Sequence, residues 1–211
     1  MKKRLLVVVD MVNGFINKGA LADKGINKIT PNILKLMDKA KEKNIPIVAF
    51  RDCHEMTDAE FKFYPPHCLK GTSESDFIPE LKNRENDFSL IIDKNTTNGF
   101  LTPEFQDFIK KNYFDEVVIT GCCTDICVYD FCESLINYIA ENNLDTEIVI
   151  PYNCVDTFNG VNNDRIIRQI NALDYLAQTG FVKIKGNKQI EEFFNRSAEE
   201  YRCEDEEMYK Y

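Results

Sequence analysis

Short apolar runs alternate along the chain with segments of helical periodicity. Six runs have the length and composition of β-strands, at residues 4–9, 45–50, 88–92, 116–120, 146–150 and 181–184. Runs that are apolar almost throughout are typical of strands buried on both faces, as in a parallel sheet. Because helical segments separate the runs, we expect an α/β fold in which a doubly wound parallel sheet carries helices on both faces.

Helices are predicted where apolar residues recur three and four positions apart. The first begins at Pro31 after Thr30 as its N-cap, because proline is favoured at the first helical position. Further helices are expected at about 103–112, 124–140 and 162–178. The inner face of the last helix is predicted to comprise Ile166, Ile170, Leu173 and Leu176 or Ala177.

Composition and charge limit the class of protein and its partners. We expect residues 1–211 to form one domain that ends in an acidic extension at 186–211, because no linker-like stretch divides the chain. A net charge of −9 without a basic cluster argues against nucleic acid as a partner, and the longest apolar run, at 5–9, is too short to span a membrane. Eight cysteines in a chain with no other secretory feature suggest reduced thiols in a cytoplasmic protein.

Reactive side chains follow four of the predicted strands. Asp10, Asp52 and Lys94 come after the first three, and Cys127 lies in the turn after the fourth. In doubly wound sheets, ligands bind beyond the carboxyl ends of the strands, where the strand order reverses. We therefore expect these four side chains to meet at one edge of the sheet.

The stretch 121–128 places Cys127 in the first turn of a helix that follows a strand and a glycine turn. A helix N-terminus lowers the pKa of a thiol and makes it nucleophilic. Asp10 would accept the thiol proton, and Lys94 would stabilise the carboxylate and a thiolate. The alternatives are a buried structural cysteine, an aspartate that caps an element, and a surface lysine.

Both histidines of the chain fall in one loop beside an aspartate. Asp52 and His54 are two residues apart, so an extended segment directs both to one side, and His67 follows thirteen residues later. One carboxylate and two imidazoles suit a single divalent metal ion, zinc before iron or manganese, with positions left open. The alternative is a loop with two histidines and no metal. Glu60 is either a further ligand or a solvated acid, and we favour the solvated acid.

Three aromatic residues, Phe15, Tyr64 and Phe100, lie in the loops after the first three predicted strands. Either they pack these loops, or they form an apolar slot for a flat ring. We expect this slot, together with Cys122, to be the substrate pocket.

Four stretches in combination resemble the isochorismatase-like cysteine hydrolases, and within them the nicotinamidases (pyrazinamidases). They are 7–15 with the acid, 51–54 and 64–72 with the metal loop, 93–95 with the lysine and 121–128 with the nucleophile. The resemblance extends to about residue 185. It implies a three-layer fold with a six-stranded parallel sheet of order 3-2-1-4-5-6. It also implies a cis peptide bond between Cys122 and Cys123 and an oxyanion site formed by the N–H groups of Cys123 and Cys127.

By this resemblance, the chain would hydrolyse nicotinamide, or a close aromatic amide, to the acid and ammonia through a cysteine thioester, as in NAD salvage. A divalent metal ion on Asp52, His54 and His67 would bind the ring nitrogen. We expect a small amide as the only partner besides further copies of the chain in a homo-oligomer. The alternatives are a related cysteine amidase for a carbamoyl or ureido substrate, and a metal- or redox-responsive binding protein that uses its thiols.

The sequence departs from the usual nicotinamidase pattern near the expected slot. Residues 12–15 read Val-Asn-Gly-Phe where the relatives usually have Gln-Asn-Asp-Phe, and Tyr64 stands where a tryptophan is common. The loop after Lys94, at 95–100, also differs. These changes leave the expected chemistry intact and bear on the identity of the substrate.

Overall fold

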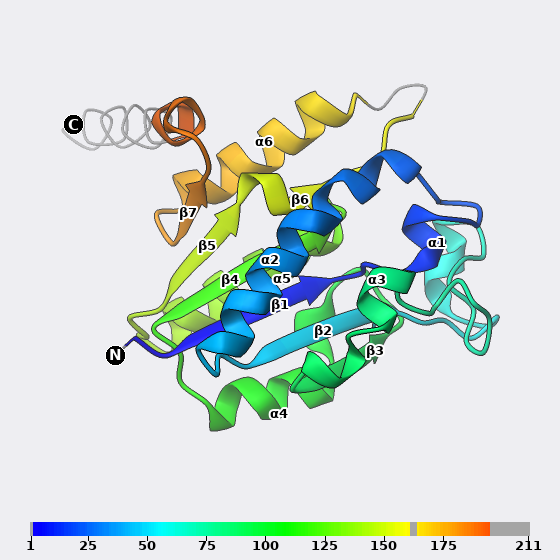
Figure 1. Cartoon of the computed structure of the whole chain (residues 1–211), viewed down its shortest axis with the longest axis horizontal. Helices are drawn as coiled ribbons and strands as arrows, with labels where there is room; N and C mark the ends of the chain where they lie inside the picture. The colour runs from blue at the N-terminus through cyan, green and yellow to red at the C-terminus, as the bar shows by residue number, and fades with distance from the viewer. Residues whose placement is uncertain (1, 161–163, 195–211) are drawn as a thin grey trace, which may run out of the picture.

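A parallel β-sheet forms the middle layer of the computed structural model, which describes residues 2–160 and 164–194 (Figure 1). Its strands are β1 (Arg4–Val9), β2 (Ile47–Asp52), β3 (Leu90–Lys94), β4 (Glu116–Cys122), β5 (Glu147–Pro151), β6 (Val155–Asp156) and β7 (Val182–Lys185). Six of them follow the order β3-β2-β1-β4-β5-β7, with parallel neighbours throughout. The predicted strand order is therefore confirmed, and the last predicted strand corresponds to β7.

The short strand β6 is an addition that the sequence did not suggest. It has two residues and pairs with β4 at Gly121 and Cys122. Two residues are too few to give a hydrophobic period, so the sequence pattern predicts no strand here. Beside it, the Thr124 N–H donates to the Asp156 carbonyl oxygen at 3.0 Å, which ties the segment after β5 to the turn before Cys127.

Two strands run further than their apolar residues predict. β2 and β3 include Asp52 and Lys94, which are register partners at the ends of the two strands. Their polar side chains are buried but compensate each other, because Lys94 Nζ lies 2.8 Å from Asp52 Oδ1. The hydrophobic pattern alone stops at the last apolar residue and therefore ends these strands too early.

Helices cover both faces of the sheet and complete the predicted three layers (Figure 1). The α-helices are α1 (Asn13–Ile16), α2 (Thr30–Glu42), α3 (Pro79–Lys82), α4 (Pro103–Lys111), α5 (Cys127–Glu141) and α6 (Arg165–Gln178). The 3₁₀ helices are η1 (Lys24–Ile29), η2 (Ala59–Lys62), η3 (Glu85–Asp87), η4 (Gly99–Leu101) and η5 (Tyr152–Cys154).

The strand β1 shows why its apolar run is continuous. Leu5, Val7 and Val9 belong to a core that also contains residues of α4, α5 and α6. The alternate residues Leu6 and Val8 belong to a second core with residues of α1, α2 and α3. Since side chains of a strand point to opposite faces in turn, both sets must be apolar when both faces are covered.

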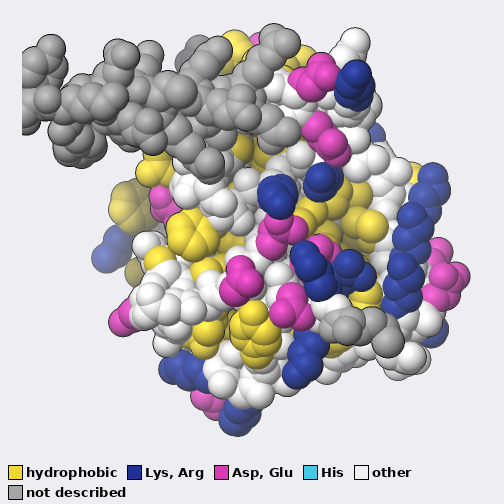
Figure 2. All heavy atoms as spheres, turned by 90° about the vertical axis from the view of Figure 1, so that its left-hand side faces the viewer, with side chains coloured by type: hydrophobic (Ala, Val, Ile, Leu, Met, Phe, Trp, Pro, Cys, Tyr) yellow, Lys and Arg dark blue, Asp and Glu magenta, His cyan; other side chains and the backbone are white. Residues whose placement is uncertain are grey.

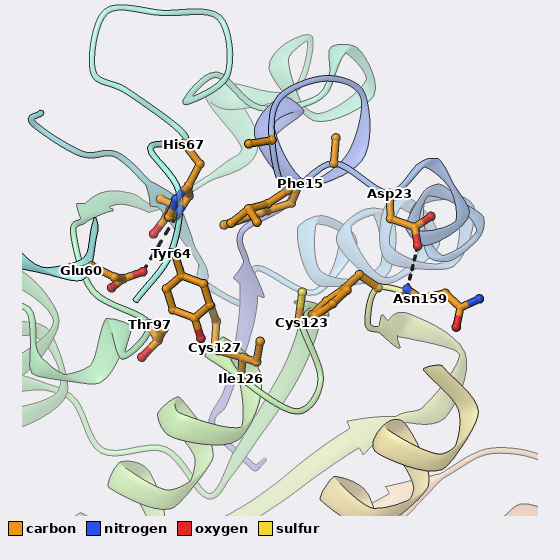
Figure 3. A pocket seen from close by; sticks show the side chains of 15 residues that line it. Phe15, Asp23, Glu60, Tyr64, His67, Thr97, Cys123, Ile126, Cys127 and Asn159 are labelled. Atoms are coloured by element: carbon orange, nitrogen blue, oxygen red, sulfur yellow. Dashed lines mark hydrogen bonds and ion pairs between the residues drawn. The ribbon is translucent and has the colours of Figure 1, made fainter. Parts of the chain in front are cut away.

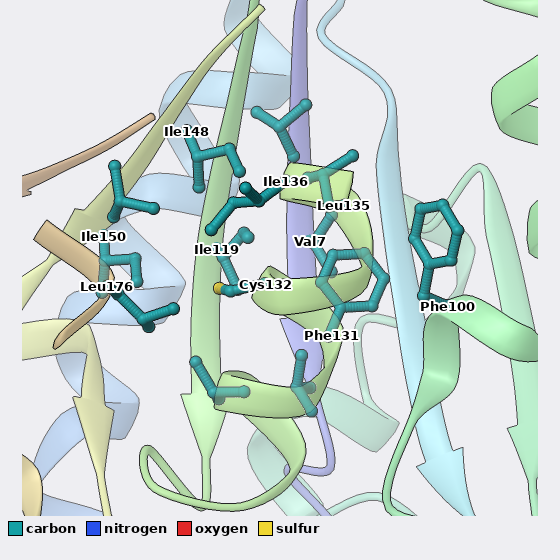
Figure 4. Close-up of a cluster of buried hydrophobic side chains, with 14 of the residues drawn as sticks. Val7, Phe100, Ile119, Phe131, Cys132, Leu135, Ile136, Ile148, Ile150 and Leu176 are labelled. Carbon is teal, nitrogen blue, oxygen red and sulfur yellow. The ribbon is translucent and has the colours of Figure 1, made fainter. Parts of the chain in front are cut away.

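The helix α5 anchors the first core (Figure 4). Its fully buried residues Phe131, Cys132 and Leu135 point toward the strands, where Val7 and Ile119 lie. Burial of each large apolar side chain contributes roughly 1.5–3 kcal/mol to folding. The helix begins at Cys127, three residues later than predicted, because residues 124–126 form a turn in which the Ile126 N–H donates to the Cys123 carbonyl oxygen.

The predicted inner face of α6 is wrong at its start. Leu173, Leu176 and Ala177 are buried as expected, but Ile166 is 65% exposed. Basic residues determine the contacts of the first turn instead. Arg165 forms an ion pair with Asp23, and Arg168 forms one with Asp125.

The predicted acidic extension lies only partly within the described residues. Residues 188–194 are helical, and Phe194 is buried with its ring 6.4 Å from that of Tyr152, so this part packs on the domain. Residues 195–211 lie outside the described part of the chain. No helix within the described ranges has the length and apolar character needed to cross a membrane. Basic, acidic and isolated hydrophobic side chains are interspersed on the face at the amino ends of the strands (Figure 2).

Candidate active site

The strand ends bring an acid, a cation and a thiol together. Asp10 follows β1, Lys94 ends β3, and Cys127 begins α5 just after β4. Lys94 Nζ lies 2.8 Å from Asp10 Oδ2 and 3.9 Å from Cys127 Sγ. The three side chains are buried, and the ammonium group links the carboxylate to the sulfur. The expectation that these residues meet at one edge of the sheet therefore agrees with the geometry.

Burial and a neighbouring cation act in opposite directions on the charge state of Asp10. Burial raises the pKa of Asp10 to about 7, although the Lys94 ammonium acts in the opposite direction. Lys94 is itself desolvated, but Asp10 and Asp52 raise the pKa of Lys94 well above its usual value, so it stays protonated. A carboxyl group that titrates near neutrality can both accept and return a proton.

The thiol of Cys127 differs from the expectation in one respect. A helix N-terminus was expected to lower its pKa, but burial raises the pKa of Cys127 well above its usual value, and Lys94 only partly offsets this. Burial and the nearby carboxylates of Asp10 and Asp52 disfavour a thiolate in this enclosed position. The resting group is a thiol, and it needs a neighbouring base to become a nucleophile.

The turn before Cys127 has a backbone that requires glycine. Gly121 has φ +113°, and a Cβ atom there would lie 2.0 Å from the Val9 carbonyl oxygen. Without a side chain, β4 can approach β1 closely at its end. The peptide bond between Cys122 and Cys123 is cis, as the resemblance implied. As the first residue of α5, Cys127 has an N–H with no partner inside the helix.

Four further side chains meet beside this turn and form what we call the metal-ligand group: Asp52, His54, Glu60 and His67. One ligand atom from each lies within 4.8 Å of the others. Asp52 Oδ2 is 2.9 Å from the Nε2 atoms of both His54 and His67, and Glu60 Oε1 is 3.9 Å from each. Glu60 thus belongs to the group, and its interpretation as a solvated acid is wrong.

The donor set fits a divalent metal ion. Two imidazoles and two carboxylates are ligands that zinc, iron and manganese share. Although burial favours protonation of Asp52, the Lys94 ammonium and the imidazoles hold the pKa of Asp52 well below its usual range. A permanently ionised carboxylate is the form that binds a cation. Within the described residues, this is the one cluster of histidine, cysteine and acidic side chains that suits a metal, and it contains no cysteine.

The outer nitrogens of both imidazoles also have partners. His54 Nδ1 lies 3.2 Å from Asp58 Oδ2, and His67 Nδ1 lies 2.8 Å from the Pro65 carbonyl oxygen. Asp58 is held in turn by the Glu55 N–H at 2.9 Å and the Asn95 amide at 3.2 Å. A histidine that donates from Nδ1 keeps Nε2 free as a ligand atom, and Asp58 is therefore placed to orient His54.

A cavity of about 320 Å³ opens over Cys127 and the metal-ligand group (Figure 3). Phe15 and Tyr64 line it, as expected of the substrate slot. The other lining residues include Thr97, Cys123, Ile126, Ala20, Leu21, Ala22, Asp23, Phe158 and Asn159.

Two expected pocket residues do not line this cavity. Phe100 packs in the first core, with its ring 5.4 Å from that of Phe105 and 5.9 Å from that of Phe131. Phe100 follows Gly99, the first residue of η4, and its side chain is buried in the core instead of lining the cavity. Cys122 is fully buried on the other side of the turn, where its Sγ donates to the Asp10 carbonyl oxygen at 3.2 Å.

The residues of this site lie within the range that a known protein family matches. A family model described as the isochorismatase domain matches residues 4–180. Nicotinamidase 1 of Arabidopsis thaliana is 37% identical over 140 residues, which cover 60% of this chain and 57% of the relative. The chain thus matches less than two thirds of the length of that protein.

Two solved structures have similar folds. The pyrazinamidase of Pyrococcus horikoshii in complex with zinc has a TM-score of 0.71 at 25% identity, over 87% of this chain and 99% of that one. The N-carbamoylsarcosine amidase of Thermoplasma acidophilum has a TM-score of 0.71 at 25% identity, over 88% and 97% of the two chains.

Proposed function

The chain belongs to the isochorismatase family, and we propose that it is a cysteine amidase that hydrolyses nicotinamide, or a close aromatic amide, to the acid and ammonia. In this proposal it contributes to NAD salvage in the cytoplasm. One observation carries the proposal. Cys127, which lies beside the buried pair of Asp10 and Lys94, lines the same cavity as three members of the metal-ligand group, Asp52, Glu60 and His67.

Asp52 connects the two halves of this arrangement. One carboxylate oxygen is 2.8 Å from Lys94 Nζ, and the other faces the two imidazoles. A metal ion held by Asp52, His54, Glu60 and His67 would act as a Lewis acid toward a ring nitrogen of the substrate. Held in this way, the ring would lie at one end of the cavity, with its carboxamide toward Cys127.

The covalent step begins with proton transfer from the Cys127 thiol to the Asp10 carboxylate. The sulfur then attacks the amide carbon, and Lys94 remains beside both groups as a fixed positive charge. The N–H groups of Cys123 and Cys127 would donate to the oxyanion, an interaction whose loss costs roughly 3–4 kcal/mol per donor in other enzymes. When the C–N bond breaks, the proton on Asp10 passes to the leaving ammonia.

The second half of the reaction regenerates the thiol. Asp10, again a carboxylate, accepts a proton from water as the water oxygen attacks the thioester carbon. The C–S bond breaks, the acid leaves, and the proton returns to the Cys127 sulfur. A pKa of about 7 for Asp10 suits both directions of transfer near neutral pH.

Release of ammonia and nicotinic acid from nicotinamide tests the proposal directly. The full chain loaded with zinc, iron or manganese should turn over nicotinamide, and a chelator should stop the reaction. Cys127→Ala should abolish turnover, whereas Cys132→Ala, on the same helix but inside the core, should retain it in folded protein. Wild-type rates in Cys127→Ala, or no turnover by the metal-loaded protein, would refute the proposal.

A second candidate function rests on the likeness to N-carbamoylsarcosine amidase. A carbamoyl or ureido compound could use the same acid, lysine and thiol without a ring nitrogen to place on a metal. Turnover of N-carbamoyl amino acids by protein freed of metal, without turnover of nicotinamide, would favour this candidate. The composition of the metal-ligand group, with two imidazoles and two carboxylates, favours the first.

A further inference from the structure

The cavity continues past Cys127, away from the metal-ligand group. Figure 3 shows His67, Glu60 and Tyr64 on one side of Cys127 and Cys123, and Asp23 and Asn159 on the other. The walls on that far side include Ala20, Leu21, Ala22 and Phe158, which we call the apolar end. The nucleophile thus lies between a charged end and an apolar end of one cavity.

The apolar end suits an uncharged group. Among the described lining residues, Asp23 is the one charged side chain there, and its carboxylate is already engaged. It accepts from the Gly25 N–H at 2.7 Å and the Asn159 N–H at 2.9 Å, and it pairs with the Arg165 guanidinium. These contacts tie the 20–23 segment to the 158–159 segment. Ala20, Leu21, Ala22 and Phe158 supply the apolar walls toward the cavity, with Asn159 as a polar neighbour.

The size of the cavity exceeds what a single ring needs. A volume of about 320 Å³ corresponds to roughly ten water molecules at about 30 Å³ each. It is close to the lower end of the range, about 300 Å³, for cavities that enclose drug-sized ligands. Nicotinamide held between the metal-ligand group and Cys127 would occupy the part of the cavity beside His67 and Glu60.

The position of the nucleophile indicates which part of the substrate enters the apolar end. With the ring nitrogen at the metal-ligand group and the carboxamide carbon at Cys127, the carboxamide oxygen and nitrogen both lie on the side of the ring away from the metal. The N–H groups of Cys123 and Cys127 would hold the oxygen, so a substituent on the leaving nitrogen is the part that can extend into the cavity beyond. We propose that the enzyme also hydrolyses secondary nicotinamides, whose amide nitrogen carries an alkyl group that binds in the apolar end. This inference rests on the proposed function and adds a substrate class to it.

The reaction of such a substrate needs no further reagent. The Cys127 sulfur forms a bond to the carbonyl carbon, the C–N bond breaks, and the proton held by Asp10 goes to the departing alkylamine. Water then cleaves the thioester and gives the same nicotinic acid. The products differ from those of nicotinamide only in that a primary amine replaces ammonia.

The test compares three amides on the metal-loaded full chain, with nicotinic acid or its ring-substituted counterpart as the measured product. N-butylnicotinamide should be hydrolysed with a KM about tenfold below that of nicotinamide, because its alkyl chain leaves water. 5-Butylnicotinamide carries the same group on the ring and should gain no such advantage. If nicotinamide reacts and N-butylnicotinamide does not, the inference is overturned while the proposed function stands. If no amide reacts, both fail.

Substitution at the apolar end locates the effect. Ala22→Phe should lower kcat/KM for N-butylnicotinamide relative to nicotinamide about tenfold or more, because the new ring occupies the alkyl site. Ile167→Phe, on the exposed side of α6, adds a comparable ring outside the cavity and should leave the ratio unchanged. Should Ala22→Phe fail to fold, Leu21→Ala removes an apolar contact and should lower the same ratio. An unchanged ratio in the folded variant would overturn the assignment.

Discussion

The two ends of the cavity differ in how they are built. At the charged end, Asp52 and His67 line the cavity and Asp10, His54 and Lys94 lie beneath it, and all five are at most 2% exposed. Glu60, which also lines this end, is partly buried. Three of these residues end or follow strands of the central sheet. At the apolar end, Leu21, Ala22 and Phe158 are only partly buried and lie in connecting segments. Asp10, Asp52 and Lys94 are therefore fixed by the sheet, whereas connecting segments supply the walls of the apolar end.

This difference predicts separate consequences for substitutions at the two ends. A change at the charged end removes a partner from a closed network of ions, so stability and activity should fall together. A change at the apolar end alters a wall that faces the cavity, so substrate preference should change while the fold persists.

Lys94→Met should have the largest effect. Without the ammonium, the carboxylates of Asp10 and Asp52 remain buried without their cation, and breaking such a buried arrangement costs about 3–5 kcal/mol of folding free energy. Urea unfolding measures the loss, with Lys35→Met on the exposed side of α2 as the control. The double variant Lys94→Met/Asp10→Asn should regain part of the stability and none of the activity. Unchanged stability in Lys94→Met would contradict a closed ion network.

Asp10→Asn should reduce kcat/KM for nicotinamide by about 10²–10⁴-fold, since a general base is lost while the neutral side chain still fits. The wild-type rate should also depend on pH. Asp10 must be ionised to accept the thiol proton and has a pKa of about 7, so kcat/KM at saturating metal should fall as pH drops below about 7. This acidic limb should be missing from the residual rate of Asp10→Asn. A limb that persists unchanged would assign the titration to another group.

Asp58→Asn should have an intermediate effect that metal can reverse. Asp58 contacts the outer nitrogen of His54, and loss of such a carboxylate lowers metal affinity by about 10–100-fold. Competition with a chelator measures the affinity directly, and excess metal should restore most of the rate. Glu55→Gln alters a neighbouring exposed acid that pairs with Lys70, and it should change neither value. Equal affinity in Asp58→Asn and wild type would remove Asp58 from a positioning role.

Asp23→Asn should have the smallest effect. It weakens the ion pair with Arg165 and the link between the two wall segments at a partly exposed position, where such pairs contribute about 0–1 kcal/mol. We expect the melting temperature to change little and the KM for N-alkylated amides to rise a few-fold, with kcat for nicotinamide nearly unchanged. A collapse of kcat for nicotinamide would show that the two ends are not independent.

The sequence by itself determined the parts of the protein that follow from local chemistry and periodicity. Continuous apolar runs such as 4–9 identified strands buried on both faces, and alternation with helical segments predicted the layers and the parallel sheet. The residues that follow those runs, Asp10 and Cys127 among them, were identifiable because parallel strands place their carboxyl ends at one edge.

Only the tertiary structure decided properties that depend on distant neighbours. The pKa of Cys127 rises because other elements enclose the thiol, and this burial is not visible in the local sequence that predicts the helix start. Glu60 joins the metal-ligand group because η2 turns it toward two histidines, and Phe100 leaves the expected slot because η4 packs it against α4 and α5. Likewise, the apolar end forms where residues near 21 and 158 meet. No hydrophobic period marks that meeting, because long-range contacts, and not local propensity, create it.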